Sequence, residues 1–138
     1  MNSLPKAILC DIDGTIALRG DRDPHDLSNV VEDAPNRDLL PLLHVLSKVY
    51  TIVYVSGRED WCRPATEYWL QTHGWPHGPL LMRRTGDNRP DNEAKEELYD
   101  HFILPSFAPV AVFDDRNRVV AMWRRRGLLC LQVADGDF

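Results

Sequence analysis

Two carboxylates follow an apolar segment near the amino terminus, at a spacing that suits one small ligand. In AILCDIDGT the apolar residues lead directly to Asp11, and Asp13 stands two positions later. Residues i and i+2 of an extended chain point to the same side, so both can address one ion or one reacting atom. Gly14 permits a sharp turn, and the Thr15 hydroxyl can orient the pair. The pair suits a metal ion or a nucleophile with its acid–base partner, although a DxDG surface turn without function is the alternative.

Polar groups also follow two later apolar segments. TIVYVS ends at Ser56, and Gly57 and Arg58 come next, so a hydroxyl, a backbone amide and a guanidinium are available to an oxyanion such as phosphate. An ordinary strand-to-helix loop with a capping serine would look the same. The segment VAVF is followed by Asp114 and Asp115, which bring a second pair of carboxylates.

A lysine and the balance of charge extend this set. We expect Lys95 in the first turn of a helix, where a cation opposes the helix dipole, and such a departure is typical of functional positions, although a solvated lysine is the commoner alternative for a single lysine on a helix. Four carboxylates at one place would repel one another, so we expect a hard divalent cation with oxygen ligands, and Mg²⁺ fits best. No single motif is strong evidence, but their combination is. The four carboxylates are those of Asp11, Asp13, Asp114 and Asp115.

Length, charge and cysteine content limit the class of protein. The chain has 138 residues and predicts one domain, 1–138, with a substantial core. A net charge of −5 argues against a protein that coats nucleic acid, although most of its 16 cations are arginines, which suit bidentate contacts to phosphate. The amino terminus shows no signal peptide or membrane span. Because no long apolar segment is present, we expect no membrane partner. The three cysteines are widely spaced and odd in number, so we expect a reduced, cytoplasmic setting.

The elements that must position these groups alternate along the chain. Short apolar runs without alternation are typical of strands covered on both faces, and helical patterns lie between them. We therefore expect an α/β fold, a Rossmann-like three-layer sandwich with a five-stranded, mainly parallel sheet, whose strand ends bring the polar groups to one edge. The expected strands are 7–10, 51–56, 80–82, 110–113 and 128–133. The expected helices are 39–50, 63–73, 92–102 (with Asn92 as N-cap) and 116–127.

The order of these motifs resembles that of the haloacid dehalogenase (HAD) superfamily of phosphotransferases. The resemblance implies that Asp11 attacks phosphorus and becomes an aspartyl phosphate. It implies that Asp13 protonates the leaving alcohol and then activates water, while Ser56 and Lys95 hold the phosphoryl oxygens. The implied ligands of Mg²⁺ are Asp11, Asp114, Asp115 and the carbonyl of Asp13.

Longer segments resemble the phosphatase domain of bacteriophage-type polynucleotide kinase-phosphatase. The similar segments are RGDRDPHD, VSGRED, RRTGDNRPDNEAKEELY, VFDDRNRVVAMWRRRG and LQVADGDF, which together with DIDGT cover nearly the whole chain. The resemblance implies a polynucleotide 3′-phosphatase of DNA or RNA repair, with action on 2′,3′-cyclic ends as well. Arg22 and Arg58 match arginines that contact substrate. The substrate-binding residues implied are Thr15, Arg22, Gly57, Arg58, Arg84 and Arg89.

Two departures bear on partners and substrates. The phosphate-binding signature GxxxxGK[ST] of a kinase is absent, so we expect a stand-alone phosphatase, with a kinase or ligase partner, or a piece that has lost an amino-terminal kinase domain. The short connection between Asp13 and Ser56 leaves no room for a large cap domain, and an uncapped site admits a polymer end. The alternatives are a small-molecule phosphatase of the same superfamily and, less favoured, a signalling receiver domain. Among the tryptophans, most are expected in the core and Trp75 is the candidate for stacking on a base.

Overall fold

A parallel sheet forms the centre of the molecule. The computed structural model describes residues 3–138. The strand order is β5-β4-β1-β6-β7, and each neighbouring pair is parallel, so the expected five-stranded sheet is confirmed. The strands are β1 (Lys6–Cys10), β4 (Thr51–Glu59), β5 (Leu80–Arg83), β6 (Ala108–Asp114) and β7 (Cys130–Gln132).

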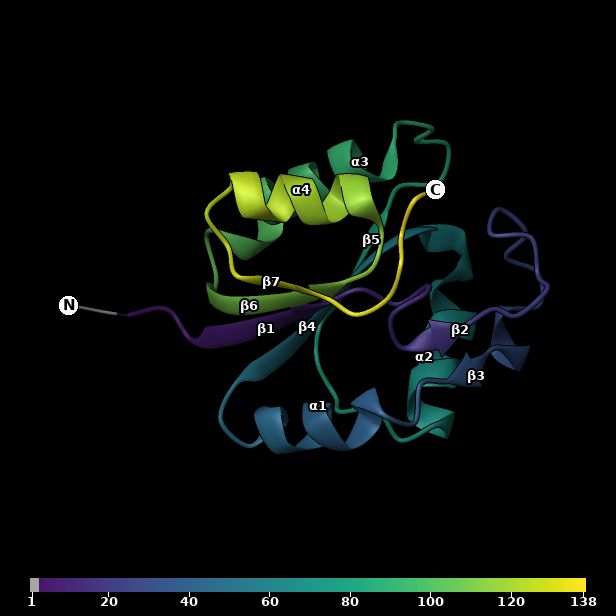
Figure 1. The fold of residues 1–138 in the computed structure, drawn as a ribbon, viewed down its shortest axis with the longest axis horizontal. Coiled ribbons are helices and arrows are strands. Elements are labelled where there is room, and N and C mark those ends of the chain that lie inside the picture. Colours follow the sequence, from purple (N-terminus) through teal and green to yellow (C-terminus); the bar gives the residue numbers. More distant parts are fainter. Residues whose placement is uncertain (1–2) are drawn as a thin grey trace.

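Helices cover both faces of this sheet. Figure 1 shows α1 (Leu39–Ser47) below the sheet and α3 (Asp91–Leu98) and α4 (Asn117–Arg125) above it, while α2 (Arg63–Thr72) shares the lower side with α1. The π-helical turn η3 (Tyr99–Ile103) continues α3. The three-layer α/β sandwich is therefore confirmed. Within residues 3–138 no helix combines the length and the apolar composition needed to cross a membrane.

Strand side chains alternate between two apolar layers. Ile8 and Ile52 belong to the apolar cluster between the sheet and the helices α1 and α2. Leu9 and Val53 belong to the cluster between the sheet and the helices α3 and α4. All four are buried. Because both faces are covered, the strands are apolar at successive positions, and this is why the sequence lacks the alternation of a half-exposed sheet.

The connection from β1 to α1 contains only small elements. It carries the two-stranded antiparallel pair of β2 (Ala17–Leu18) and β3 (Ala34–Pro35) and the 3₁₀ turn η1 (Val30–Glu32). The expected absence of a large cap domain is confirmed for this segment, which lies beside the carboxyl edge of the sheet (Figure 1). The carboxyl edge is therefore accessible to a large molecule.

The third helix begins earlier than the sequence predicts. The expected N-cap was Asn92, but α3 starts at Asp91 and Pro90 precedes it as the capping residue. Pro90 keeps the chain extended just before the helix. The first helical residue is then Asp91, whose negative charge is favourable at the positive end of the helix dipole. Lys95 is consequently the fifth residue of α3, so the expectation that it lies in the first turn was wrong.

Packing of η3 against the sheet can be tested with two neighbouring residues. Ile103 is fully buried, whereas Leu104 is 43% exposed. We expect Ile103→Ala to lower the free energy of unfolding by about 2–5 kcal/mol, because it leaves a cavity, and Leu104→Ala to lower it by less than about 1 kcal/mol. Urea denaturation of the two variants measures both values. Equal losses would contradict the assignment of Ile103 to the core.

Candidate active site

Three adjacent strands deliver acidic and hydroxyl groups to the carboxyl edge of the sheet. Asp11 follows β1, Ser56 lies within the neighbouring β4, and Asp114 ends β6 on the other side of β1, with Asp115 next to it. All four side chains are buried. The structure thus brings together residues about a hundred positions apart, as the parallel strands predicted.

Lys95 lies among these carboxylates. Its Nζ donates to Asp11 Oδ1 at 2.6 Å and to Asp114 Oδ2 at 3.1 Å, and only 1% of the residue is exposed. Burial by itself would lower the pKa of Lys95, but the carboxylates of Asp11, Asp114 and Asp91 raise it well above its ordinary value. Lys95 is therefore a fixed positive charge at the floor of the site.

The acids outnumber this cation. Carboxylate oxygens of Asp11, Asp114 and Asp115 lie within 4.8 Å of one another. Burial, aided by the charge of Asp114, raises the pKa of Asp11, and burial likewise raises the pKa of Asp115. Three buried carboxylates beside one lysine leave an excess of negative charge, and an all-oxygen donor set of this kind suits a hard divalent metal ion. The cluster therefore fits such an ion by its chemistry.

Neighbouring groups orient the three carboxylates. The Thr15 hydroxyl donates to Asp11 Oδ2 at 2.8 Å. The indole of Trp123 donates to Asp114 Oδ2 at 3.1 Å, and the backbone amide of Asp115 donates to the other oxygen of Asp114. Gly14 has φ of 84°, and a Cβ there would collide with the Asp115 carboxylate, so only glycine fits. Thr15 therefore supports Asp11, and it is itself buried, rather than lining the cleft.

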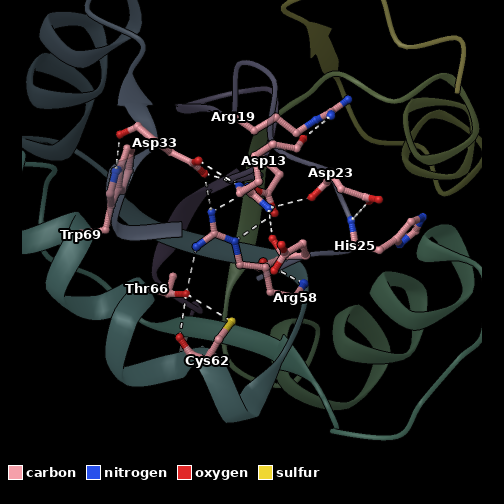
Figure 2. Close-up of polar contacts among 12 residues, drawn as sticks. Asp13, Arg19, Asp23, His25, Asp33, Arg58, Cys62, Thr66 and Trp69 are labelled. Atoms are coloured by element: carbon pink, nitrogen blue, oxygen red, sulfur yellow. Dashed lines mark hydrogen bonds and ion pairs between the residues drawn. The ribbon is translucent and has the colours of Figure 1, made fainter. Parts of the chain in front are cut away.

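The Asp13 side chain lies apart from this cluster. Its side chain is 32% exposed and points to Arg58, as Figure 2 shows, and it also contacts Arg22. Arg58 donates from Nε to Asp13 Oδ2 at 2.9 Å and from Nη2 to Oδ1 at 2.7 Å, and Arg22 adds a contact of 3.2 Å. The carboxylate of Asp13 is therefore not a member of the metal-type cluster. The role expected for its backbone carbonyl stays a prediction.

A buried acid that the sequence analysis missed holds both arginines. Asp33 accepts from Arg22 Nε at 3.0 Å and Nη2 at 2.9 Å, and from Arg58 Nη2 at 3.3 Å. Thr66 of α2 accepts from Arg58 Nη1 at 3.0 Å, and Trp69 donates to the carbonyl of Asp33 (Figure 2). Arg58 is only 3% exposed. This network fixes the direction of the Asp13 carboxylate.

Asp91 was also missed. Its Oδ1 accepts from Arg83 at 3.0 Å, and its Oδ2 lies 3.8 Å from Lys95 and from Arg116. Burial would raise the pKa of Asp91, but the three cations lower it. A Cβ at Gly57 would collide with this carboxylate, so the absence of a side chain at Gly57 leaves the space that the Asp91 carboxylate occupies. The i, i+4 spacing to Lys95 on one helix was a signal that could have found it.

The acidic cluster, through Asp11 and Asp115, and the carboxylate of Asp13 line one cleft of about 890 Å³. Its walls include Asp11, Asp13, Gly57, Arg58 and Asp115. Ser56 lies just beneath, where its Oγ accepts from the backbone amide of Arg58 at 3.0 Å. The cleft is therefore continuous from the acidic cluster to the arginine network.

The two remaining arginines of the expected substrate set lie at the periphery. Arg89 lines the cleft but is paired with Asp87 and Glu97, each at 2.7 Å. Arg84 is exposed, outside the cleft lining, and makes no ion pair within residues 3–138. Neither residue contacts the acidic cluster, so both are on the rim of the site rather than in it.

Buried acids, a lysine and a hydroxyl at the carboxyl edge of a parallel sheet are typical of an α/β phosphotransferase. The chain belongs to the family of the polynucleotide kinase PNKP phosphatase domain, whose model matches residues 5–138. Membership of this family implies a divalent metal ion, which the aspartate cluster fits.

Relatives of known sequence or structure agree with this assignment. The "Putative bifunctional polynucleotide kinase/RNA ligase" of Autographa californica nuclear polyhedrosis virus is 34% identical over 127 residues, which are 89% of this chain and 18% of that protein. A chain of the Pnkp1/Rnl/Hen1 RNA repair complex superposes with a TM-score of 0.94 at 41% identity, and the match covers 98% of this chain and 44% of that one. A second structure of that complex gives 0.95, with coverage of 100% and 49%. The chain thus spans half or less of the length of these relatives.

The arginine network can be tested through Asp33. Asp33→Asn keeps the size of the side chain but removes one of the two carboxylates that balance the buried Arg58 and the part-buried Arg22, so that Asp13 alone faces both cations. We expect the free energy of unfolding to fall by about 3 kcal/mol or more, because an uncompensated buried charge is costly. Urea denaturation measures the change.

Asp21→Asn, in the same connection but exposed and without an ion pair within residues 3–138, is the matched control and should change stability by less than about 0.5 kcal/mol. Equal unfolding midpoints for Asp33→Asn and the unmodified protein would contradict the structural role of Asp33.

Proposed function

We propose that this protein is a metal-dependent phosphomonoesterase that removes the 3′-phosphate from DNA or RNA ends through an aspartyl phosphate. The observation that carries the proposal is the buried Asp11, held by Lys95 and Thr15 at the floor of a cleft that no cap domain covers. Family membership supports a phosphatase, and the printed names of the relatives support a role in nucleic-acid repair.

In the first step Asp11 attacks phosphorus. A bond forms between its carboxylate oxygen and phosphorus, while the bond from phosphorus to the ester oxygen breaks. The leaving alkoxide takes a proton from Asp13, which is the part-exposed acid nearest in sequence and faces the same cleft. Fixing the nucleophile in advance avoids the entropy cost of bringing it to the phosphate.

The proton transfer requires a change at Asp13. Both of its oxygens accept hydrogen bonds from Arg58, and one also from Arg22. A carboxyl that donates its proton must release at least one of these arginine contacts. The anionic phosphate can take over the freed N–H groups, so substrate binding itself would prepare Asp13 as an acid. This accounts for arginines that are paired in the free protein and still serve the substrate.

In the second step water hydrolyses the aspartyl phosphate. The oxygen of the water bonds to phosphorus while Asp13, now ionised, takes a proton from that water. The bond between phosphorus and the Asp11 carboxylate oxygen breaks. Ser56, the Gly57 amide and Lys95 hold the phosphoryl oxygens through both steps. Lys95 is suited to this because its charge is fixed and its ammonium already contacts Asp11.

We assign Mg²⁺ as the metal ion. Asp11, Asp114, Asp115 and the Asp13 carbonyl would hold it, and all of these donors are oxygens, as Mg²⁺ prefers. When bound, the ion would offset the negative charge of the nucleophile and the phosphate. Lys95, the lone cation in direct contact with Asp11 within residues 3–138, supplies the rest of that neutralisation.

We propose that the chain acts as one domain alongside a kinase and a ligase. The relatives it matches are longer, and their names combine polynucleotide kinase with RNA ligase or place them in an RNA repair complex. Removal of a 3′-phosphate creates the 3′-hydroxyl that a ligase must join, so the phosphatase step precedes ligation.

The specificity of the reaction is measured with matched oligonucleotides carrying either a 3′- or a 5′-phosphate, with and without Mg²⁺. We expect phosphate release from the 3′ end alone, its loss in the presence of EDTA, and its return when Mg²⁺ is added. Equal release from both ends, or release from small phosphate esters only, would favour a small-molecule phosphatase and refute the nucleic-acid substrate.

The nucleophile is tested by Asp11→Asn. We expect kcat to fall by about 10⁴-fold or more, because the amide cannot form the aspartyl phosphate. Asp21→Asn, an exposed acid outside the cleft, is the control and should keep full activity. Substantial activity in a folded Asp11→Asn protein would exclude Asp11 as the nucleophile.

A further inference from the structure

One of the four tryptophans is not part of the core. Trp69, Trp75 and Trp123 are buried, with at most 5% of each residue exposed, whereas 54% of Trp61 is exposed. The expectation that Trp75 is the candidate for stacking on a base is therefore wrong, because its indole is packed 6.1 Å from that of Trp69. Trp61, which lies in the 3₁₀ turn η2 (Asp60–Cys62), is the exposed indole instead.

Trp61 belongs to the same cleft as the candidate nucleophile. It lines the cleft together with Asp11, Asp13 and Gly57. It follows Ser56, Gly57 and Arg58 along the chain by only a few residues, so the loop that would hold the phosphate leads directly to the indole. A group attached to a phosphate bound in this cleft therefore lies within reach of Trp61.

The turn that carries Trp61 is fixed in place. The backbone amide of Trp61 donates to the hydroxyl of Thr85 at 3.1 Å. Thr85 in turn donates from its amide and its hydroxyl to Asp60 Oδ1, at 3.1 and 2.7 Å. These bonds join the loop after β4 to the loop after β5. The indole is thus held on a rigid support, which lowers the entropy cost of binding a ligand against it.

The indole itself has no partner in the part of the chain that the structure describes. The aromatic pairs involve Trp69, Trp75 and Trp123, and Trp61 takes part in none of them. Two of these three buried tryptophans also make hydrogen bonds, since Trp69 donates to the carbonyl of Asp33 and Trp123 donates to the carboxylate of Asp114. The exposed indole offers a flat apolar face inside the cleft, and covering that face with a base removes apolar surface from water. Among the arginines of the cleft lining, Arg83, Arg89 and Arg116 lie close to carboxylates. Arg19 and Arg118 make no ion pair within residues 3–138, so their charges are available to the phosphates of a nucleic acid.

We propose that Trp61 is the stacking platform for the base of the 3′-terminal nucleotide, while the terminal phosphate occupies the site at Asp11. The proposal rests on the function proposed above. Stacking on an indole does not read the identity of a base, since every base has an aromatic face. The protein therefore accepts any terminal nucleotide, with tighter binding of the larger purines than of pyrimidines.

The first test measures kcat and KM for oligonucleotides with a 3′-phosphate on either an adenosine or an abasic terminal residue. We expect Trp61→Ala to raise KM for the adenosine substrate about 5- to 100-fold with little change in kcat, and to leave KM for the abasic substrate unchanged. Trp61→Phe should restore much of the binding, because it keeps an aromatic face. Tyr68→Ala removes a 62% exposed aromatic residue of α2 outside the cleft, and it should have no effect.

A second readout does not depend on turnover. An oligonucleotide with 2-aminopurine at its 3′-phosphorylated terminus is titrated with the Asp11→Asn protein, and stacking on Trp61 quenches its fluorescence. Adding Trp61→Ala to that protein should abolish most of the quenching. Unchanged quenching, or a KM that rises equally for the abasic substrate, would overturn the stacking role. If the unmodified protein releases no 3′-phosphate but quenching still requires Trp61, the proposed function fails and the stacking platform stands.

Discussion

The contact between Lys95 and Asp11 is the interaction on which the arrangement of this site depends. A fully buried ammonium is stable only beside carboxylates, and buried carboxylates are stable only beside cations. Here the lysine comes from a helix above the sheet and its acids come from two neighbouring strand ends. Strand order, the position of α3 and the proximity of Asp114 must therefore all be correct before either charge is tolerated. The excess of acid left after this pairing is what gives the site its capacity for a metal ion.

A second charge network lies beside the cluster of Lys95 and its carboxylates, and it contains arginines in place of the lysine. Asp33 and the two arginines orient one part-exposed carboxylate, that of Asp13, instead of a metal-type cluster. Asp11 thus belongs to an environment rich in carboxylates and Asp13 to one rich in guanidinium groups, although only one residue separates them. Two acids in different surroundings can perform different steps of one reaction, which is the division that the proposed mechanism requires.

Much of the fold could be predicted from the sequence, because buried parallel strands are apolar at every position and their carboxyl ends share an edge. Asp11 and Asp114 were found for the same reason, since Asp11 directly follows β1 and Asp114 is the last residue of β6. Asp33 could not be found, because it lies in a polar connection whose path over the sheet edge depends on tertiary contacts with α2. Trp61 was misjudged because the helical periodicity of the following segment does not describe a short 3₁₀ turn. The roles of these residues in catalysis stay proposals, whereas their positions are observed.

The central place of β1 in the sheet has a kinetic consequence. This first strand pairs with β4 on one side and with β6, about a hundred residues later, on the other. Such distant pairing makes folding slow, because the entropy cost of closing a long loop comes before the contact can lower the free energy. Asp11 is synthesised well before its partners, because Lys95 lies 84 positions later in the chain and Asp114 follows Lys95. In the proposed mechanism a partly synthesised chain therefore carries the nucleophile without Lys95 and Asp114, so phosphate chemistry cannot begin before α3 and β6 have been made and packed against β1.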